Sequence, residues 1–485
     1  MRKDAQIIIS SVFWLAMALF WFLAYPQALG FQEQNQLFLF TWDYLGERLS
    51  VTGGLADWIA EFLTQFNYIP WLGALLLSGL FVLLQMLVWK LSDSDSLEWY
   101  PLSYIPSLLV LMHMGDIYAM PAHLVALVLA AALSLVYMRN PSLWLPLAAI
   151  PLGFWLIGPA IWIFVLFVVF FHRKPADLLY PLYLLAIIFL YRATFMQQYP
   201  PKSVFFGVNY YRWPLTVPVL QLAVAALVFV VPVIVRFLPK ARNSLMVAVS
   251  LACVIVAGAY FGVRATYGRD TYEIIAYDQL IRHEKWQKVV DRASLYQPKS
   301  DIGCVSVNLA LFMTGKMDLM DDFYQCGTRG LIMPRVRDLI SNVSSYEVFW
   351  RMGFVNSALR YAFDSQESEM NYRKSGRFMS KMAECQIVNG RYEVARKYLD
   401  ILKHSLFYSK WAKSKELLLG NEGLIAADPV YSYLRAVKFS DRFLFNYGEM
   451  DKMLYILAAR NENNIMARSY FMAWKRLQEA GGGEQ

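Results

Sequence analysis

Residues 70–90 read PWLGALLLSGLFVLLQMLVWK, and their only charged side chain is Lys90 at the end of the stretch. An α-helix needs about 20 consecutive apolar residues to cross the roughly 30 Å hydrocarbon core of a membrane. The stretch meets this requirement and therefore predicts a transmembrane helix.

Similar apolar stretches recur on both sides of residues 70–90. The expected spans lie near 6–26, 70–90, 101–115, 119–138, 142–158, 159–172, 177–197, 214–237 and 244–264. The pair 142–172 is either two tight spans broken at Gly158-Pro159 or one re-entrant element. No small-residue cleavage site follows the first stretch, which indicates a retained span and not a signal peptide. We expect an all-α fold that begins with a helical membrane bundle of about nine spans, over residues 1–264.

The composition agrees with a membrane protein. Of the 485 residues, 58% are hydrophobic and 17% are charged, whereas an average soluble domain is about 45–50% apolar and about 25% charged. An ordinary soluble enzyme and a disordered chain are both excluded by this balance. The formal net charge is +8, but no long run of Lys and Arg is present, so a nucleic-acid partner is not expected.

Positive residues gather at alternate ends of the expected spans. These residues are Arg2, Lys3, Lys90, Arg139, His172, Arg173, Lys174, Arg236, Lys240 and Arg242. Cytoplasmic loops of membrane proteins carry an excess of Lys and Arg. With an odd number of spans, all five groups face the cytoplasm. We therefore expect an inner-membrane protein with a cytoplasmic N-terminus and a periplasmic C-terminal half.

Residues 265–485 are more polar, and their apolar residues recur at helical spacing, which predicts a second helical domain. Residues 389–395, NGRYEVA, resemble the start of the second helix of a tetratricopeptide repeat, where a small residue such as Ala395 lies at the helix crossing. Residues 284–298 and Gly315 mark looser copies. The resemblance implies helical hairpins whose surface binds an envelope protein, and an unrelated helical bundle is the alternative.

The four cysteines contain no CxxC motif, which argues against a zinc site. Cys304, Cys326 and Cys385 lie in the polar half, and Cys253 lies in an apolar stretch. A disulfide between Cys304 and Cys326 is expected if this half faces an oxidising compartment. Free buried thiols are the alternative.

The loop at residues 28–69 is the longest connection between the expected spans. Its second part has apolar residues at i, i+3, i+4, i+7, i+8 and i+11, namely Leu55, Trp58, Ile59, Phe62, Leu63 and Phe66. Asp57, Glu61 and Gln65 occupy the other side. This pattern predicts an amphipathic helix that lies in the membrane interface. In the preceding helix, Asp43 and Glu47 are four residues apart and share one face.

The same loop is strongly acidic. It carries Glu33, Asp43, Glu47, Asp57 and Glu61 but only one basic residue, Arg48. These acids could hold a divalent metal or supply a general base, with Asp43, Glu47 and His113 as the candidate metal ligands. The alternative is that they form the solvated faces of two interfacial helices.

Two further loops carry polar residues on the same expected side. HMGDIYAMPAH, residues 113–123, contains His113, Asp116 and His123, and Asp116 lies either within the membrane or in an external turn. Residues 197–214 contain Lys202 and Arg212, and Arg192 precedes them. Cations on the external side could bind a phosphate through charge-assisted hydrogen bonds, and an aromatic belt with ordinary flanking charges is the alternative.

This arrangement resembles the polytopic glycosyltransferases of the GT-C fold, which use lipid-phosphate-linked sugars. Their first external loop commonly carries the essential acid. The resemblance implies that Asp43, then Asp57 and Asp116, are catalytic, and that Arg192, Lys202 and Arg212 bind the phosphate of a polyprenyl-phosphate sugar. No paired acidic motif occurs in the loop, and the tail contains no WWD motif. The chain also resembles a family of uncharacterised multi-pass membrane proteins from Bacteroidota.

Three functions follow as hypotheses. The first is a GT-C-like glycosyltransferase in envelope glycan assembly. The second is a non-enzymatic scaffold whose tail binds envelope proteins, and the third is a transporter or flippase. Motifs for ATP hydrolysis, serine hydrolysis, zinc proteolysis and dinucleotide binding are absent from the sequence.

Overall fold

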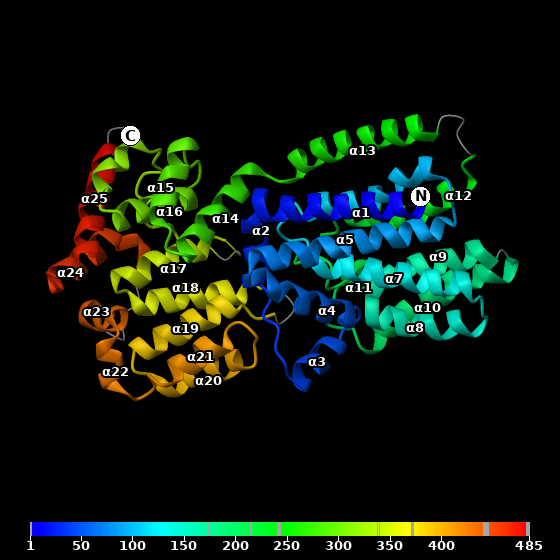
Figure 1. Ribbon diagram of the computed structural model, residues 1–485. Coiled ribbons are helices and arrows are strands. Elements are labelled where there is room, and N and C mark those ends of the chain that lie inside the picture. The colour runs from blue at the N-terminus through cyan, green and yellow to red at the C-terminus, as the bar shows by residue number, and fades with distance from the viewer. Residues whose placement is uncertain are drawn as a thin grey trace. The chain divides into compact units, whose positions relative to one another are not determined.

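The structure is a computed structural model that describes residues 2–172, 174–213, 216–239, 244–336, 338, 340–369, 373–439 and 446–481. These residues form helices joined by turns and loops, without a β-strand among them, so the predicted all-α class is confirmed (Figure 1). Arg173, Lys240 and Arg242 of the expected positive groups lie outside the described residues.

The chain divides into two compact units. Unit 1 comprises Met1–Glu33 and Phe40–Gly268, and unit 2 comprises Gln34–Leu39 and Arg269–Gln485. The short segment Gln34–Leu39 interrupts the first loop of the membrane half, and nothing in the sequence indicates that it belongs with the tail.

Unit 1 contains thirteen α-helices among its described residues. They are α1 (Arg2–Leu19), α2 (Pro26–Gln34, whose last residue is assigned to unit 2), α3 (Trp42–Leu49), α4 (Gly54–Thr64), α5 (Pro70–Ser92), α6 (Ile105–His113), α7 (Pro121–Arg139), α8 (Trp144–Ile157), α9 (Ile161–His172), α10 (Leu179–Thr194), α11 (Pro201–Phe206), α12 (Val219–Phe237) and α13 (Ser244–Thr266). Local signals set several of their ends. The Thr41 side chain accepts a hydrogen bond from the Tyr44 amide at the start of α3, and Pro70 opens α5.

Seven helical stretches of unit 1 are long and apolar enough to cross a membrane, fewer than the nine expected spans. The expected third span, 101–115, is a 3₁₀ helix of eight residues (Leu97–Tyr104) followed by the nine residues of α6. Neither helix alone has the roughly 20 residues that a membrane-crossing α-helix needs. The segment is therefore not among the seven.

The expected fifth and sixth spans form one apolar stretch, Trp144–His172. Gly158 breaks this stretch with φ 67° and ψ −153°, a conformation essentially restricted to glycine. Gly153 in α8 lies so close to Ile161 in α9 that an added Cβ would lie 2.3 Å from the Ile161 Cδ1. Residues eight apart in a continuous helix would be about 12 Å apart. The chain therefore turns back at Gly158, and α8 and α9 form two short arms.

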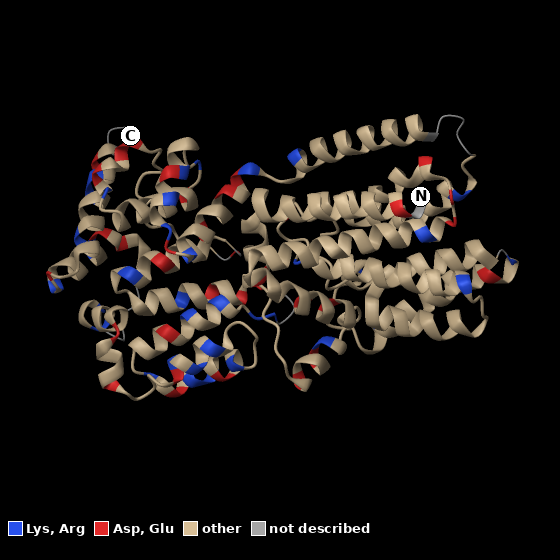
Figure 2. Cartoon of the chain, in the orientation of Figure 1, with Lys and Arg blue, Asp and Glu red and all other residues tan. Residues whose placement is uncertain are grey.

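The helices of unit 1 have two chemically distinct ends. At the first, which we call the basic end, the termini of α5, α9 and α12 meet: Arg236 pairs with Asp93 at 3.2 Å and lies over the Phe171 ring. At the other, which we call the loop end, residues 28–33, 40–69, 114–120, 158–160 and 197–213 meet. Charged residues concentrate toward these ends and are sparse along the long helices between them (Figure 2).

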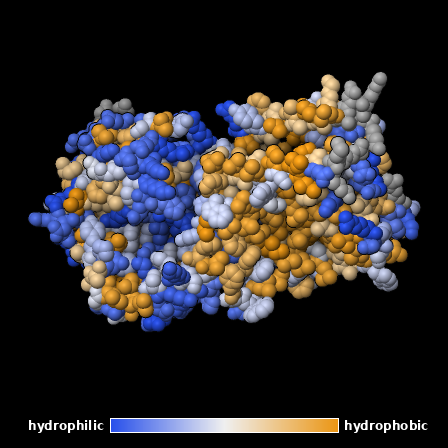
Figure 3. Space-filling model, in the orientation of Figure 1, coloured by the Kyte–Doolittle hydropathy of each residue, from blue (hydrophilic) through white to orange (hydrophobic). Residues whose placement is uncertain are grey.

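The outer surface of unit 1 is apolar over much of the face seen in Figure 3, whereas unit 2 shows mainly polar residues there. Large apolar side chains with more than half of their area exposed include Val12, Leu152, Leu182, Phe189, Val219 and Val254. Together with the seven long apolar helices, this surface identifies unit 1 as a multi-pass membrane domain.

Unit 2 consists of α-helices that pair as hairpins. They are α14 (Arg269–Arg282), α15 (Trp286–Leu295), α16 (Asp301–Met313), α17 (Ser341–Met352), α18 (Val355–Glu367), α19 (Gly376–Val388), α20 (Tyr392–Lys403), α21 (Ser409–Glu416), α22 (Glu422–Ala427), α23 (Pro429–Val437), α24 (Met450–Arg460) and α25 (Ile465–Gly481). Gly353 and Gly390 adopt positive φ at the α17–α18 and α19–α20 turns. Ala395 is fully buried in α20.

Candidate functional site

The loop end of unit 1 contains a buried ionic cluster that joins α3 to α4. Arg48 Nε lies 2.9 Å from Glu61 Oε2 and 4.0 Å from Asp57 Oδ2. The Tyr44 hydroxyl donates to the same Glu61 oxygen, and Arg48 Nη2 donates to the Tyr44 hydroxyl over 3.3 Å. All four side chains are buried, and Glu61 is fully so. We call these residues the α3–α4 clamp.

The clamp decides how the two sides of α4 are placed. The interpretation of Asp57 and Glu61 as a solvated helix face is wrong, because both carboxylates point into the protein. The apolar side of α4, including Trp58 and Phe62, is only half-buried, and so is Phe66 in the 3₁₀ helix that follows (Gln65–Tyr68). An α-helix with its polar side inside and its apolar side outside is suited to an apolar surrounding, where buried charges must be paired.

The environment of the clamp favours one arrangement of charges. Burial alone lowers the pKa of the Arg48 guanidinium, but Glu61, Tyr44 and Asp57 outweigh burial and raise this pKa well above its ordinary value. Burial and the Glu61 carboxylate both raise the pKa of the Tyr44 hydroxyl well above its ordinary value. Arg48 therefore remains a cation and Tyr44 a neutral donor at any physiological pH.

Asp43 and Glu47 occupy a different side of α3 from the clamp residues. Both side chains are exposed, while Tyr44 and Arg48, the neighbouring residues in sequence, are buried. The clamp thus holds α3 in place, and α3 presents two carboxylates one turn apart on its free side. Of the three predicted catalytic acids, Asp43 is the one that is open to a ligand. Asp57 is buried and lies beside Arg48.

A second polar group at the loop end joins the segments 113–123 and 209–212. The Tyr211 hydroxyl donates to Asp116 over 2.5 Å, and the Tyr118 amide donates to the same carboxylate. The rings of His113 and His123 are 5.6 Å apart and at right angles. Asp116 lies in the turn between α6 and α7, which agrees with the expectation of a turn over a position within a span.

The histidine pair is almost completely buried. His113 Nε2 and His123 Nδ1 have no hydrogen-bond partner among the residues that the structure describes. Asp43, Glu47 and His113, the predicted metal ligands, do not form a cluster: within the described ranges, no three His, Cys, Asp or Glu side chains are placed to hold a metal ion.

The three predicted phosphate-binding cations have different environments. Arg212 is buried and donates from Nη2 to Gln32 Oε1 over 3.0 Å, so it connects the loop before α12 with α2. Lys202 is exposed in α11. Arg192 is half-buried at the end of α10, and its Nε has no hydrogen-bond partner in the described part of the chain. Lys202 is therefore accessible to an anion, whereas the Arg192 Nε atom is itself buried and Arg212 has a structural contact.

A contact that the sequence did not indicate holds these loops together. The Gly53 amide donates to the Trp155 carbonyl over 2.8 Å, and the Ala160 amide donates to the Tyr210 hydroxyl over 3.1 Å. Gly53 and Gly158 approach so closely that a Cβ on Gly158 would lie 3.5 Å from the Gly53 Cα. The sequence contains both glycines, Gly53 and Gly158, which could have indicated a close approach of two backbone segments. It did not show that these two residues meet.

A family model described as a family of unknown function, DUF6057, matches residues 3–479. The chain belongs to this family. No curated protein matches it, and no solved structure matches it. Because the family match spans both units, the membrane domain and the helical hairpins are parts of one family architecture. The family assignment does not extend to a GT-C fold or to a source organism.

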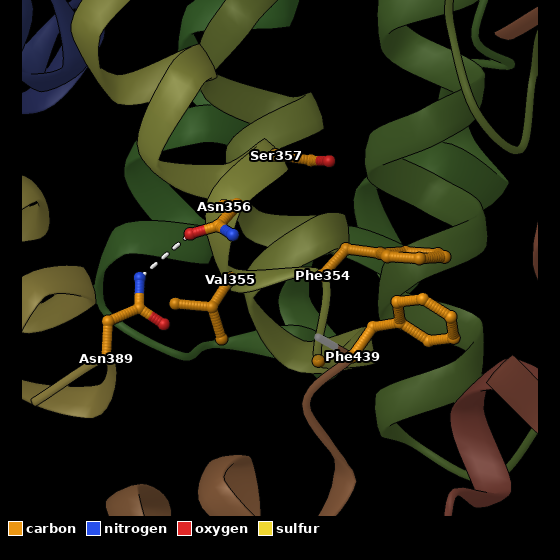
Figure 4. A pocket seen from close by; sticks show the side chains of 7 residues that line it. Phe354, Val355, Asn356, Ser357, Asn389 and Phe439 are labelled. Atoms are coloured by element: carbon orange, nitrogen blue, oxygen red, sulfur yellow. Dashed lines mark hydrogen bonds between the residues drawn. The ribbon is translucent and has the colours of Figure 1, made fainter. Parts of the chain in front are cut away.

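Two cavities of this DUF6057 chain lie in unit 2. One of about 300 Å³ is lined by Arg269, Glu273, Tyr277, Tyr296 and Lys299, among others. A second, of about 10 Å³, lies beside the α17–α18 turn, where the Asn389 side chain donates to Asn356 over 2.9 Å and Phe354 lies beside Phe439 (Figure 4). The second cavity has room for about one water molecule.

Proposed function

We propose that this protein is a membrane-embedded transferase that moves a sugar from a lipid-phosphate carrier to an acceptor hydroxyl at the loop end of unit 1. The observation that carries the proposal is the exposed pair Asp43 and Glu47 on a helix that buried charges hold in place. A catalytic acid needs both access to the substrate and a fixed position. Asp43 has both.

In this reaction Asp43 accepts the proton of the acceptor hydroxyl. The hydroxyl oxygen attacks the anomeric carbon, and the bond from that carbon to the phosphate oxygen breaks. The phosphate leaves with the electron pair, so its negative charge grows in the transition state. Arg192 and Lys202 supply positive charges that stabilise a leaving phosphate. Arg212 has no direct role, because it is buried against Gln32.

The location of these residues supports a lipid-linked substrate. The outer surface of unit 1 is apolar over much of the face in Figure 3, which suits contact with a polyprenyl chain, and charged residues concentrate toward the ends of its helices (Figure 2). The positive residues at the basic end support placing that end in the cytoplasm. The loop end then faces the periplasm of an inner membrane, where envelope glycans are assembled.

The test is complementation of a deletion strain, read by mass spectrometry of envelope glycans and lipid-linked sugars. We expect Asp43→Asn to abolish one glycan feature and to accumulate its lipid-linked precursor, with the protein at wild-type level because Asp43 is exposed. Asp95→Asn is the matched control, because Asp95 is also exposed but lies beyond α5 at the basic end. We expect it to behave as wild type.

Other variants separate catalysis from folding. Arg192→Gln and Lys202→Gln are expected to weaken turnover without lowering protein level. Asp57→Asn is expected to lower protein level, because Asp57 lies in the clamp. Unchanged glycans and precursors in both Asp43→Asn and Glu47→Gln, with normal protein level, would exclude the transferase.

A second candidate is binding of an envelope protein by unit 2. The observation that favours it is a set of exposed apolar side chains on α21–α23, namely Leu417, Leu424 and Val430. Solenoids of helical hairpins commonly bind partners along such surfaces, although kinship to tetratricopeptide repeats is itself part of this proposal. A photo-crosslinker at position 417 should trap one defined envelope protein. Lys410, which is exposed on α21 seven residues before Leu417, is the matched control position. Absence of any adduct specific to position 417 would count against this function.

A further inference from the structure

The loop that follows α16 brings two cysteines of unit 2 together. Cys304 lies in α16 and Cys326 lies in the loop, 22 residues later in the chain. Their Sγ atoms are 3.3 Å apart. Cys304 is buried, whereas Cys326 is half-buried and accessible from solvent.

Hydrogen bonds of other residues hold this loop against α16. Asn308, one turn after Cys304, exchanges two side-chain hydrogen bonds with Gln325, at 2.9 and 3.2 Å. Asn308 also donates to the Gly330 carbonyl over 2.8 Å. The Tyr324 amide donates to the Gln297 side chain over 2.8 Å. The two thiols therefore face each other because the surrounding amides fix both segments.

The packing around Cys304 leaves little room for the thiols to separate. A Cβ on Gly330 would lie 3.0 Å from the Cys304 Cβ and 3.3 Å from the Cys326 amide nitrogen. A larger residue at position 330 would press on both cysteine segments. Within the described residues, neither cysteine is part of a group that could hold a metal ion, so metal binding does not explain the pair.

We propose that Cys304 and Cys326 are joined by a disulfide in the cell, and that unit 2 consequently lies in an oxidising compartment. The oxidant is an exchange protein that carries a reactive disulfide. The Cys326 thiolate attacks one sulfur of that disulfide and releases the other sulfur as a thiolate. The Cys304 thiolate then attacks Cys326 Sγ in the mixed disulfide and releases the second sulfur. The chain loses two protons and two electrons, and the exchange protein becomes a dithiol.

The chemical environment explains why an exchange protein is needed. Burial raises the pKa of the Cys304 thiol well above its ordinary value, and burial also raises the pKa of Cys326. The thiolate is the nucleophile, so little of either reactive form exists at neutral pH. Oxidation by air after cell breakage is therefore slow, which makes the redox state in the cell measurable.

The test counts free thiols in the full-length chain. Intact cells are quenched with acid, the protein is denatured without reductant, and its thiols are alkylated with a maleimide and counted by mass spectrometry. Of the four cysteines, we expect only Cys253 and Cys385 to be labelled. A tryptic peptide that joins Cys304 to Cys326 should appear and should disappear after reduction.

Three variants complete the design. Cys304→Ser leaves three cysteines, and all three should be labelled. Cys253→Ser should retain the joined peptide, because Cys253 is exposed in α13 and far from the pair in sequence. Cys385→Ser tests exchange among the buried thiols and should also retain the joined peptide. Labelling of all four cysteines in the wild type, or a joined peptide with any other pair, would overturn the proposal. The outcome does not depend on whether unit 1 is a transferase.

Discussion

Glu61→Gln removes one carboxylate from the α3–α4 clamp and leaves Arg48 buried. Arg48 Nε lies 2.9 Å from Glu61 Oε2, and at this distance an ion pair contributes about 6 kcal/mol of Coulomb energy at an effective dielectric constant near 20. Desolvation of both groups offsets most of this energy in the native protein. Removing one partner of a buried pair nevertheless costs about 3–5 kcal/mol, because the remaining charge has no full counterpart.

Asp57 reduces the loss of stability that we expect from Glu61→Gln. Its Oδ2 atom is 4.0 Å from Arg48 Nε and can still neutralise part of the charge. We therefore expect Glu61→Gln to lower the free energy of unfolding of the α3–α4 region by about 3 kcal/mol, the lower end of the range for a buried pair. Since every 1.4 kcal/mol changes a population tenfold, the open form of this region becomes roughly a hundred times more populated.

Limited proteolysis measures this opening directly. Arg48 is the only Lys or Arg between residues 28 and 69, so trypsin has a single site in the loop. That site is buried in the native protein. Cleavage that follows transient opening is expected to be roughly a hundredfold faster in Glu61→Gln, when opening and closing are fast relative to cleavage.

Glu47→Gln is the matched control, because Glu47 lies in the same helix but is exposed. We expect its effect on stability to stay within about 0.5 kcal/mol. A double-mutant cycle of Glu61→Gln with Tyr44→Phe should give a coupling energy of about 0.5–3 kcal/mol, since the two side chains share a hydrogen bond. If Glu61→Gln is cleaved no faster than Glu47→Gln, α3 is not held by the clamp, and the basis for a fixed Asp43 is lost.

Three further predictions concern other parts of the chain. Gly158→Ala forces positive φ on alanine and places a Cβ 3.1 Å from the Tyr210 hydroxyl. Thermal unfolding in detergent should therefore show a free energy of unfolding that is lower by about 1–3 kcal/mol. An unchanged midpoint would contradict the turn at Gly158. Ala395→Leu overpacks the fully buried start of α20 and should destabilise unit 2 by about 1–3 kcal/mol, whereas Val394→Leu at an exposed position should not. Burial alone raises the pKa of Glu347, but Lys381, Arg351 and Arg377 outweigh burial and lower it. The ionised carboxylate therefore stabilises the folded state above its ordinary pKa of 4.5, and this stability is lost as pH falls below that value. Glu347→Gln should remove this pH dependence in circular-dichroism melts, and a variant that keeps it would show that other acids cause it.

The sequence predicted the parts of the structure that depend on local composition. The apolar stretch at 70–90 became the single helix α5, because uninterrupted apolar residues leave a membrane helix as the favoured state. Arg236 pairs with Asp93. The end of α12 that carries Arg236 therefore lies beside the end of α5, as the pattern of positive residues predicted. The turn at Gly390 and the buried Ala395 followed from a short local motif.

Periodicity alone did not show which side of α4 faces the protein. The pattern separated Asp57 and Glu61 from Trp58 and Phe62, but it could not show which side packs against the protein. Hydrophobic periodicity identifies the two faces of a helix. In water the apolar face is the buried one, whereas in an apolar surrounding either face can be the inner one. Arg48 decided the orientation by pairing with Glu61.

The amino-acid sequence by itself determined that this is an all-α chain with a membrane half and a polar helical half. Tertiary structure alone decided which acids are exposed: it buried Asp57 beside Arg48, left Asp43 free on α3, and transferred Gln34–Leu39 to unit 2. Span length and helix spacing are local properties that neighbouring residues encode. The exposure of one carboxylate depends on which distant residues meet it, such as Arg48 with Glu61 or Gly53 with Gly158, and such contacts are set only when the whole chain packs.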